Sequence, residues 1–460
     1  MDAFSGSLSH CPPDDVTARK EDARLLAGRG DFVAGKDFEG QWFAKIVRSA
    51  QASARLVDID LSAAAEMSGV HAIVTAADLP PSVTFPDGGP EPVLATNEVR
   101  YVGQPIAMVL AMTRAIAEDA AASIDIDYQQ LPVDGLPGDA SGDQGRPPAD
   151  PVAVFRQDVN MPVEDVAVAA VVEKEFIIPR QTGMPLETRG LLARWTASPD
   201  LLTIYGMTKH PAQNRAAIAD ALKLTENQIV SPNCDIGGSF GVKGELYPED
   251  LLIPWAAHRY GATVKWIEDR QEHLHAINHS RAQRMKVRMS AAQDGRIVDV
   301  DLTIDADVGA YVRPLSGVVP YLASAMFPGP YRFPRYRASV RCWLTNRTPT
   351  GTMRAPGRVE ANFVRERMLD MLAGRLGLTP SEIRLRNLLS AADLPYDTGT
   401  INEGPVTTRL GTSAANSPRR CATTGVVPMT PNLATTVSVV ARQPCLSWRR
   451  PDCRAGRLPR

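Results

Sequence analysis

Residues 234–244 read Cys-Asp-Ile-Gly-Gly-Ser-Phe-Gly-Val-Lys-Gly, and this stretch, the first loop, restricts the fold more than any other. Before it, Asn227 to Ile236 has the pattern of a short strand; after it, Asp250 to His258 has the apolar spacing of a helix. Glycines between a strand and a helix let backbone N–H groups approach an anionic or oxo-bearing ligand, and the helix start adds partial positive charge. A tight turn without a ligand would also use glycines. Two interpretations therefore stay open, a ligand-binding loop and a plain turn.

The first loop does not match the common nucleotide-binding loops. Residues 237–241 depart from G-x-G-x-x-G, and Lys243 is followed by glycine where a phosphate-binding loop needs Ser or Thr. The bulky Phe240 in mid-loop indicates an aromatic ring pressed against a large cofactor or substrate.

A second glycine-bearing stretch, residues 348–358, has similar surroundings, and we call it the second loop. It follows an apparent strand, Tyr336 to Leu344, and precedes a strongly amphipathic helix, Val359 to Leu376. Two loops of the same strand–loop–helix order suggest that both face one ligand. Arg354 is then a candidate ligand contact; the alternative is an arginine that caps the helix or pairs with a carboxylate.

Length and composition limit the class of protein. At 460 residues the chain has room for two or three domains, each with its own core. A formal net charge of -2 gives the chain no excess of positive charge that would attract nucleic acid. Its composition, 44% hydrophobic and 22% charged residues, is ordinary for a soluble globular protein. No stretch approaches about 18 uninterrupted apolar residues, so we expect no membrane span. The polar start, Met1 to Glu21, lacks the apolar core of a secretory signal, and we expect a cytoplasmic protein.

The six cysteines are scattered, without a C-x-x-C pair. Their spacing supports neither a zinc site nor an iron–sulfur cluster nor a disulfide framework. Three histidines, at positions 273, 275 and 279, lie close together, but no acidic residue follows at the spacing of a zinc site, so polar packing is favoured. We predict no metal ligated by side chains of this chain, and electrons that leave through another chain if the protein is a redox enzyme.

The element pattern predicts an α+β fold in two parts. Residues 1–20 form a flexible lead, and residues 21–136 alternate short strands with a helix, as expected for one α/β domain. Residues 137–152 are rich in Gly, Asp and Pro, which marks a linker. A second α+β domain covers residues 153–402.

The final stretch, residues 403–460, differs in composition from the rest. It contains nine arginines, no lysine, two acidic residues, seven prolines and three of the six cysteines. Such a segment cannot bury enough apolar area to offset its ordering entropy, so we expect a disordered tail. Two origins stay open: out-of-frame translation, or a basic tail for an acidic partner.

The first loop, with Leu-Tyr-Pro at 246–248 and Val-Lys-Trp-Ile-Glu-Asp-Arg at 264–270, resembles the molybdenum-binding chain of the xanthine dehydrogenase and aldehyde oxidase family. That family includes the large chain of aerobic carbon monoxide dehydrogenase. Residues 26–30, 47–49 and 100–105 independently resemble the family's N-terminal hammerhead domain. The resemblance covers about residues 20–402 and implies a hammerhead-type domain followed by the first half of a molybdopterin-binding domain.

The resemblance also implies a site. In the family the first loop touches the molybdenum–molybdopterin cofactor, a glutamine falls at position 209, and an active-site arginine falls at position 354. The implied cofactor-binding residues are Gly237, Gly238, Ser239, Phe240, Gly241, Lys209 and Arg354. Lys209 departs from the family's glutamine, and Met353 from an aromatic residue. The second loop lacks the copper-binding cysteine of carbon monoxide dehydrogenase, which disfavours CO as substrate. Nearby, Glu187 is expected to hold Arg189 in place rather than to face the cofactor.

By resemblance the protein is a molybdenum hydroxylase large subunit, an oxidoreductase that adds water-derived oxygen to an aldehyde or N-heterocycle. Its partners would be an iron–sulfur subunit and an FAD subunit, and we expect neither of those cofactors in this chain. The family's general-base glutamate belongs to the second half of its domain, so we predict a truncated chain without a catalytic residue of its own. The alternatives are a non-catalytic remnant and half of a split enzyme completed by a separate C-terminal chain.

Overall fold

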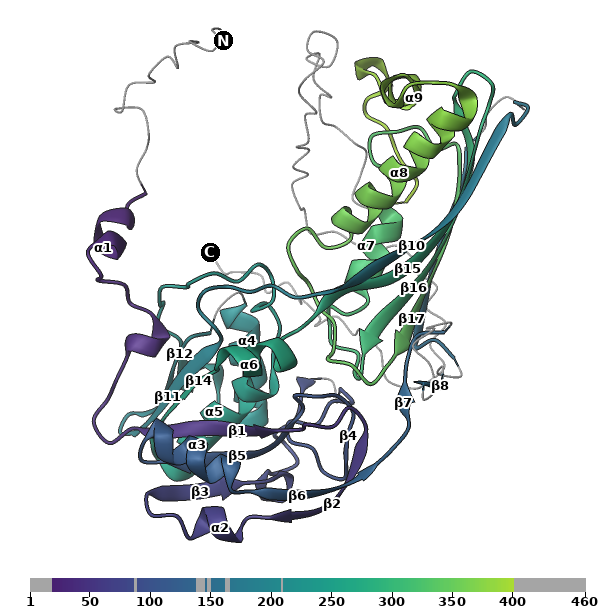
Figure 1. Ribbon diagram of the computed structural model, residues 1–460. Helices are drawn as coiled ribbons and strands as arrows, with labels where there is room; N and C mark the ends of the chain where they lie inside the picture. The colour runs from purple at the N-terminus through teal and green to yellow at the C-terminus, as the bar shows by residue number, and fades with distance from the viewer. Residues whose placement is uncertain are drawn as a thin grey trace, which may run out of the picture.

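The computed structural model describes residues 19–86, 89–137, 145–146, 150–161, 166–207 and 210–400. The predicted tail, the predicted contact Lys209, and most of the predicted lead and linker lie outside these residues. Figure 1 shows two lobes joined by long strands, one lobe built on a seven-stranded sheet and the other on a five-stranded sheet backed by helices. The predicted α+β class is confirmed. Among the described residues, no helix combines the length and apolar character needed to cross a bilayer.

Most elements before residue 150 lie in the lower part of Figure 1, with α1 higher on the left and β7 and β8 on the right. They are α1 (Asp22–Leu26), η2 (Val33–Gly35), β1 (Trp42–Arg48), β2 (Ala54–Asp60), α2 (Ser62–Ala65), β3 (Val70–Val74), η3 (Ala76–Asp78), β4 (Glu98–Val99), β5 (Pro105–Ala111), α3 (Arg114–Ala122), β6 (Asp125–Gln130), β7 (Val133–Asp134) and β8 (Gly145–Arg146). The later elements supply both lobes. They are β9 (Ala153–Asn160), β10 (Ala170–Gln181), β11 (Gly190–Ala197), β12 (Asp200–Tyr205), α4 (Pro211–Leu222), η5 (Glu226–Gln228), β13 (Ile229–Val230), α5 (Pro248–Tyr260), β14 (Thr263–Ile267), α6 (Arg270–Ala276), β15 (Ser280–Ala291), β16 (Ile297–Gly309), α7 (Val318–Ala325), β17 (Arg335–Leu344), α8 (Arg358–Leu376), α9 (Pro380–Asn387) and η6 (Ala391–Asp393).

The five-stranded sheet has the order β10-β15-β16-β17-β9. Along β16, Val300, Leu302 and Ile304 alternate with more exposed residues, as expected for a sheet with one face buried. The buried face packs against α7 and α8, where Val364 and Leu372 belong to the same core. This lobe carries the second loop between β17 and α8.

The seven-stranded sheet runs across the predicted domain boundary. Its order is β13-β12-β11-β14-β1-β5-β3, and β1 pairs in parallel with β14, with Trp42 opposite Val264. One apolar core joins Ile46 and Leu110 from the first part to Leu251 and Trp266 from the second. Residues 21–136 therefore bury much of their apolar surface against the later chain rather than only against themselves.

The helices beside the two loops follow their local signals. α5 begins with Pro248 in its first turn and ends at Gly261 in the left-handed region. α8 ends at Gly377, directly after the predicted helix end, and Thr379 with Glu382 forms the capping box of α9.

The strand expected from Asn227 to Ile236 is much shorter than predicted. Only Ile229–Val230 pairs within a sheet, in parallel with β12, and Asp235 forms an isolated bridge with Phe32. Pro232, two residues on, has no N–H to donate to a strand ladder. The chain therefore leaves the sheet before the first loop begins.

Leu110→Ala in β5 removes a fully buried side chain from the shared core, and we expect it to lower the free energy of unfolding by about 3 kcal/mol. Because the core is shared, amide protection in α5 and β14 should fall together with protection in β5, which hydrogen–deuterium exchange measures. Val57→Ala, at an exposed position of β2, is the control and should change stability by less than about 0.5 kcal/mol. Loss of protection confined to β5 would contradict a shared core.

Candidate functional site

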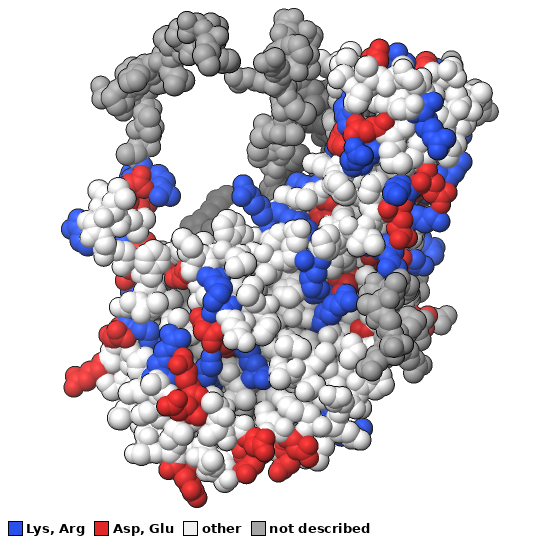
Figure 2. Space-filling view, in the orientation of Figure 1, with Lys and Arg blue, Asp and Glu red and all other residues white. Residues whose placement is uncertain are grey.

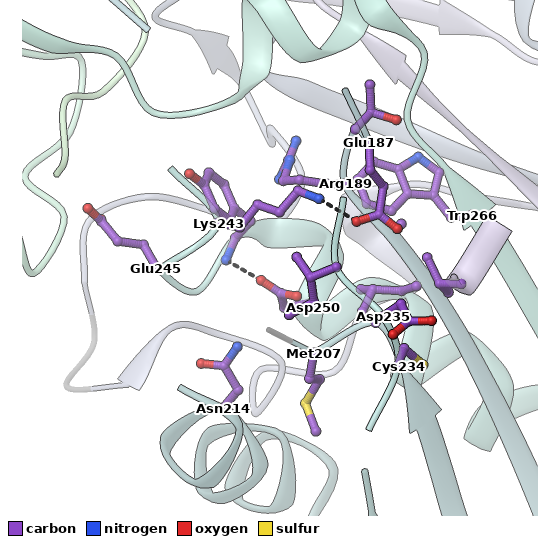
Figure 3. A pocket seen from close by; sticks show the side chains of 17 residues that line it. Glu187, Arg189, Met207, Asn214, Cys234, Asp235, Lys243, Glu245, Asp250 and Trp266 are labelled. Carbon is purple, nitrogen blue, oxygen red and sulfur yellow. Dashed lines mark hydrogen bonds and ion pairs between the residues drawn. The ribbon is translucent and has the colours of Figure 1, made fainter. Parts of the chain in front are cut away.

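Glu187 ties together the two ends of the glycine-rich part of the first loop. It lies between β10 and β11, and its Oε2 accepts hydrogen bonds from the Gly237 N–H (2.9 Å) and the Lys243 ammonium (2.8 Å). Figure 3 shows the Glu187 and Lys243 side chains directed toward one another. Burial lowers the pKa of Lys243 in spite of the opposing charge of Glu187. One carboxylate therefore fixes the span of the loop.

The expectation that Glu187 holds Arg189 is wrong. Arg189 instead donates to Glu268 Oε1 at 2.5 Å and to Glu249 Oε2 at 2.8 Å. The reason is spatial: β14 and α5 bring their carboxylates to Arg189, whereas the first loop brings its own donors to Glu187.

The backbone of the first loop is open to a ligand. Gly238 (φ +102°), Phe240 (φ +52°) and Gly241 (φ +97°) lie in the left-handed region, which only glycine enters at low cost. Among the described residues, no acceptor receives the backbone N–H groups of residues 238–241, and the buried Ser239 Oγ has no partner. Successive N–H groups in such a conformation form an anion-binding concavity.

The second loop lies directly against the first. The Arg354 N–H donates to the Phe240 carbonyl oxygen at 2.8 Å. A Cβ added to Gly241 would lie 3.0 Å from the Thr352 carbonyl oxygen, so glycine is required for this approach. The structure thus brings together two loops more than 100 residues apart in sequence, as their similar surroundings suggested.

The Arg354 side chain is exposed, and Phe240 of the first loop is 48% exposed. Within the described residues the guanidinium pairs with no carboxylate, and Gly357, not Arg354, caps α8. Neither alternative considered for Arg354 is therefore observed there, and its charge is available to a ligand.

Buried Arg281 holds the second loop in place through hydrogen bonds. Its Nη2 donates to the Arg354 carbonyl oxygen at 2.6 Å, and its Nη1 lies 3.1 Å from Glu360 Oε1 in the first turn of α8. Arg281 therefore couples the loop to the helix that follows it.

A buried ion network lies beneath the first loop. Glu249 pairs with Arg48 of β1 as well as with Arg189, and the second oxygen of Glu268 lies 2.9 Å from His273 Nδ1. Burial would raise the pKa of Glu249, but Arg189 and Arg48 outweigh burial and lower it to about 2. The network joins both predicted domains at the base of the site.

Glu245 lies between the two loops and is only 6% exposed. A Cβ added to Gly351 of the second loop would lie 1.9 Å from its Oε1, so backbone and carboxyl group are in close contact. Burial raises the pKa of Glu245 to about 7, although Arg313 and Asn278 act in the opposite direction. A proton can therefore reside on this group near neutral pH. No local pattern in the sequence marks Glu245, because its environment comes from distant residues.

A cavity opens behind the first loop (Figure 3). Glu187 and Trp266 line it, and Glu187 Oε1 and Trp266 Nε1 are buried atoms without a hydrogen-bond partner among the described residues. The cavity is also lined by Val33, Gly206, Met207, Asn214, Cys234, Asp235, Lys243, Glu245, Tyr247 and Asp250.

The three histidines do not form a metal centre. His273 is buried between Glu268 and the Gly183 carbonyl oxygen (3.1 Å), and His279 Nε2 lies 2.9 Å from the Leu274 carbonyl oxygen. Over the described ranges, no group of three or more His, Cys, Asp or Glu side chains is arranged to hold a metal ion.

The loops suit a large anionic or oxo-bearing cofactor. Where the two loops meet, the first loop has backbone N–H groups without an acceptor among the described residues, and Arg354 of the second loop carries an exposed guanidinium.

Comparison with known proteins identifies the family. Residues 150–388 match the family described as "Molybdopterin cofactor-binding domain", and residues 27–132 match "Aldehyde oxidase and xanthine dehydrogenase, a/b hammerhead domain". The chain belongs to the xanthine dehydrogenase and aldehyde oxidase family of molybdopterin-binding large subunits. The family that the sequence motifs resemble is thereby confirmed.

Three family members illustrate the relationship. The 6-hydroxypseudooxynicotine dehydrogenase complex subunit gamma of Paenarthrobacter nicotinovorans is 36% identical over 83% of this chain and 50% of its own length. The crystal structure of quinoline 2-oxidoreductase from Pseudomonas putida 86 has a TM-score of 0.78 and 31% identity, covering 86% of this chain and 52% of that one. The nicotinate dehydrogenase large molybdopterin subunit of Eubacterium barkeri is 27% identical over 79% of this chain but 86% of its own length.

The chain spans about half the length of the first curated relatives it matches. The activity, substrates and partners of a whole family member are therefore matters for proposal.

Glu245→Gln should stabilise the protein at pH 8 and stabilise it much less at pH 5. The folded-state pKa of Glu245 is raised to about 7, above the unfolded-state pKa of about 4.3, so the folded chain binds more protons than the unfolded chain between these two values, and stability falls as pH rises through that window. We expect a gain of about 1–3 kcal/mol at pH 8, measured by urea unfolding at both pH values.

Glu249→Gln is the matched control, because its folded-state pKa is shifted the other way. The Glu249 carboxylate stabilises the folded chain above its unfolded-state pKa of about 4.3, and this stabilisation is lost as pH falls toward 2. The substitution should therefore lower the free energy of unfolding at both pH 5 and pH 8, by about 3 kcal/mol. An equal effect of Glu245→Gln at pH 5 and 8 would show that Glu245 does not titrate between them.

Proposed function

We propose that the two loops hold a molybdenum–molybdopterin cofactor and that the protein is the loop-bearing part of a molybdenum hydroxylase large subunit. The observation that carries the proposal is the contact of Phe240 with Arg354, which gathers unpaired donors in a chain of this family. Figure 2 shows basic side chains around the hollow between the lobes, which suits an anionic cofactor.

Each proposed residue has a defined task. The N–H groups of Gly238, Ser239 and Gly241 would receive the cofactor's oxygen atoms, with Gly237 closing the loop through Glu187. Arg354 would neutralise negative charge, and the exposed Phe240 ring would bound the reacting centre. Lys209 is proposed as a further donor, in place of the glutamine in the family pattern. When bound, the cofactor supplies the two-electron oxidation and the water-derived oxygen.

The substrate we favour is a nitrogen heterocycle rather than an aldehyde. The relatives compared above are named for 6-hydroxypseudooxynicotine, quinoline and nicotinate, all of which are built on nitrogen heteroaromatic rings. The exposed Phe240 offers a flat apolar surface to such a ring.

The partners we propose are an iron–sulfur subunit and an FAD subunit, to which electrons pass. One relative is named as a subunit of a dehydrogenase complex, which is consistent with assembly of this kind. The general-base glutamate of the reaction would come from outside residues 19–400.

A second candidate is half of a split enzyme. The Eubacterium barkeri relative, named a large molybdopterin subunit, is matched over 86% of its own length, so a chain of about this extent can be a separate subunit. Met184, Leu186, Ile236 and Phe240 expose apolar side chains around the first loop, a surface suited to a complementary chain.

Gly241→Val should abolish cofactor retention, because a side chain there meets the second loop and φ is +97°. Arg354→Met should also weaken cofactor retention, because the substitution removes the positive charge of the guanidinium. In protein purified from a host that makes molybdopterin, we expect molybdenum per chain, measured by mass spectrometry, to fall at least about tenfold for both variants. Gly374→Ala and Arg375→Met, at open positions near the end of α8, are the controls.

Wild-type protein with less than about a tenth of a molybdenum per chain would contradict retention by this chain alone. The purified chain is then mixed with the part of the Paenarthrobacter nicotinovorans relative that the match leaves out. Molybdenum gained only in the mixture supports the split enzyme, and none in either case supports a non-catalytic remnant.

A further inference from the structure

The segment before β1 lies against the back of the first loop. Phe32 forms an isolated parallel bridge with Asp235, and the Asp235 N–H donates to the Asp31 carbonyl oxygen at 3.0 Å. These contacts lie two residues before Gly237, where the glycine-rich part of the loop begins.

Arg24 strengthens this attachment through a bidentate ion pair with Asp235. Its Nη1 and Nη2 lie 2.5 and 2.7 Å from the two oxygens of Asp235, and the Asp31 N–H donates to Asp235 Oδ2 at 2.5 Å. The Arg24 guanidinium and this N–H hold the pKa of Asp235 well below its usual range. α1 itself buries no residue, so its placement depends on Arg24 rather than on apolar packing.

The far end of the same segment is fixed to the seven-stranded sheet. The Lys265 ammonium of β14 donates to the carbonyl oxygens of Ala34 (2.9 Å) and Lys36 (2.7 Å) and to Asp37 Oδ1 (2.8 Å). Val33 is buried, and a Cβ added to Gly190 would lie 3.1 Å from it. The segment therefore spans from the rigid sheet to the loop.

We infer that residues 22–37 form a strap that positions the first loop, with Arg24 as its positioning residue. The loop's glycines lose more conformational entropy on ordering than other residues do, so contacts that order it beforehand favour ligand binding. The strap holds Asp235 directly before the glycines, and Glu187 binds Gly237 at their start and Lys243 after their end. The effect of the strap on cofactor binding rests on the proposed function, whereas its effect on the order of the first loop does not depend on that function.

Arg24→Gln should loosen the first loop without unfolding the protein. In peptides covering residues 236–244 we expect exchange of the hydrogen-bonded amides of Gly237, Val242 and Gly244 to become about threefold to fivefold faster, the range for a partly exposed ion pair, while α8 keeps its protection. Raising NaCl from about 50 to about 500 mM should accelerate loop exchange in the wild type but not in Arg24→Gln.

Two further variants separate positioning from general structural damage. The charge-reversed double variant Arg24→Glu with Asp235→Arg should restore slow loop exchange. Arg19→Gln, which removes a neighbouring pair with Asp22 in the same segment, should leave it unchanged.

Unaltered loop exchange in Arg24→Gln would overturn the strap, as would an equal rise in α8. Molybdenum content is measured on the same samples. If loop exchange responds as expected but no sample retains molybdenum, the strap stands and retention of the cofactor by this chain fails.

Discussion

Arg189 is surrounded by two buried carboxylates and two aromatic rings, and the rest of the site is arranged about it. Glu249 comes from α5, directly after the first loop, and Glu268 from the end of β14. Tyr247 and Trp266 lie under the guanidinium, at 4.1 and 5.2 Å from their ring centroids. Burying such charges is costly unless every partner is present, so a chain in which one element is misplaced would carry an uncompensated charge. The network therefore specifies the relative positions of β1, α5 and β14 more than it adds stability.

The strain in the backbone is concentrated where the two loops meet. Four of the five described non-glycine residues with positive φ are Phe240, Arg281, Ala282 and Ala355. Such conformations persist only where surrounding contacts fix them, and here the bonds of Arg281 to the second loop and to Glu360 do so. In the first loop, the Phe240 carbonyl oxygen accepts a hydrogen bond from the second loop, while the N–H groups of residues 238–241 have no acceptor among the described residues.

Local patterns predicted the helices after the two loops well but overestimated the strand before the first loop. The helix after the second loop, its glycine stop and the capping box beyond it follow from residues next to each other in sequence. The approach of the two loops was also predictable, because both have the same strand–loop–helix order. What the sequence did not reveal depends on pairs far apart: Glu187 with Lys243, and Arg24 with Asp235 across 211 residues. The assignment of Arg189 to Glu187 failed for this reason, since adjacency in sequence was taken for contact in space.

A chain spanning half the length of its first relatives can nevertheless present a formed pair of loops. Glu187 and Lys243 set the span of the first loop, and Arg281 holds the second, all within residues 19–400. No contact from elsewhere is needed to bring Phe240 to Arg354. In contrast, the Phe240 ring and the apolar side chains near it are exposed. The contact between the two loops is therefore encoded in this part of the sequence, whereas the described residues leave the apolar surface beside the loops uncovered.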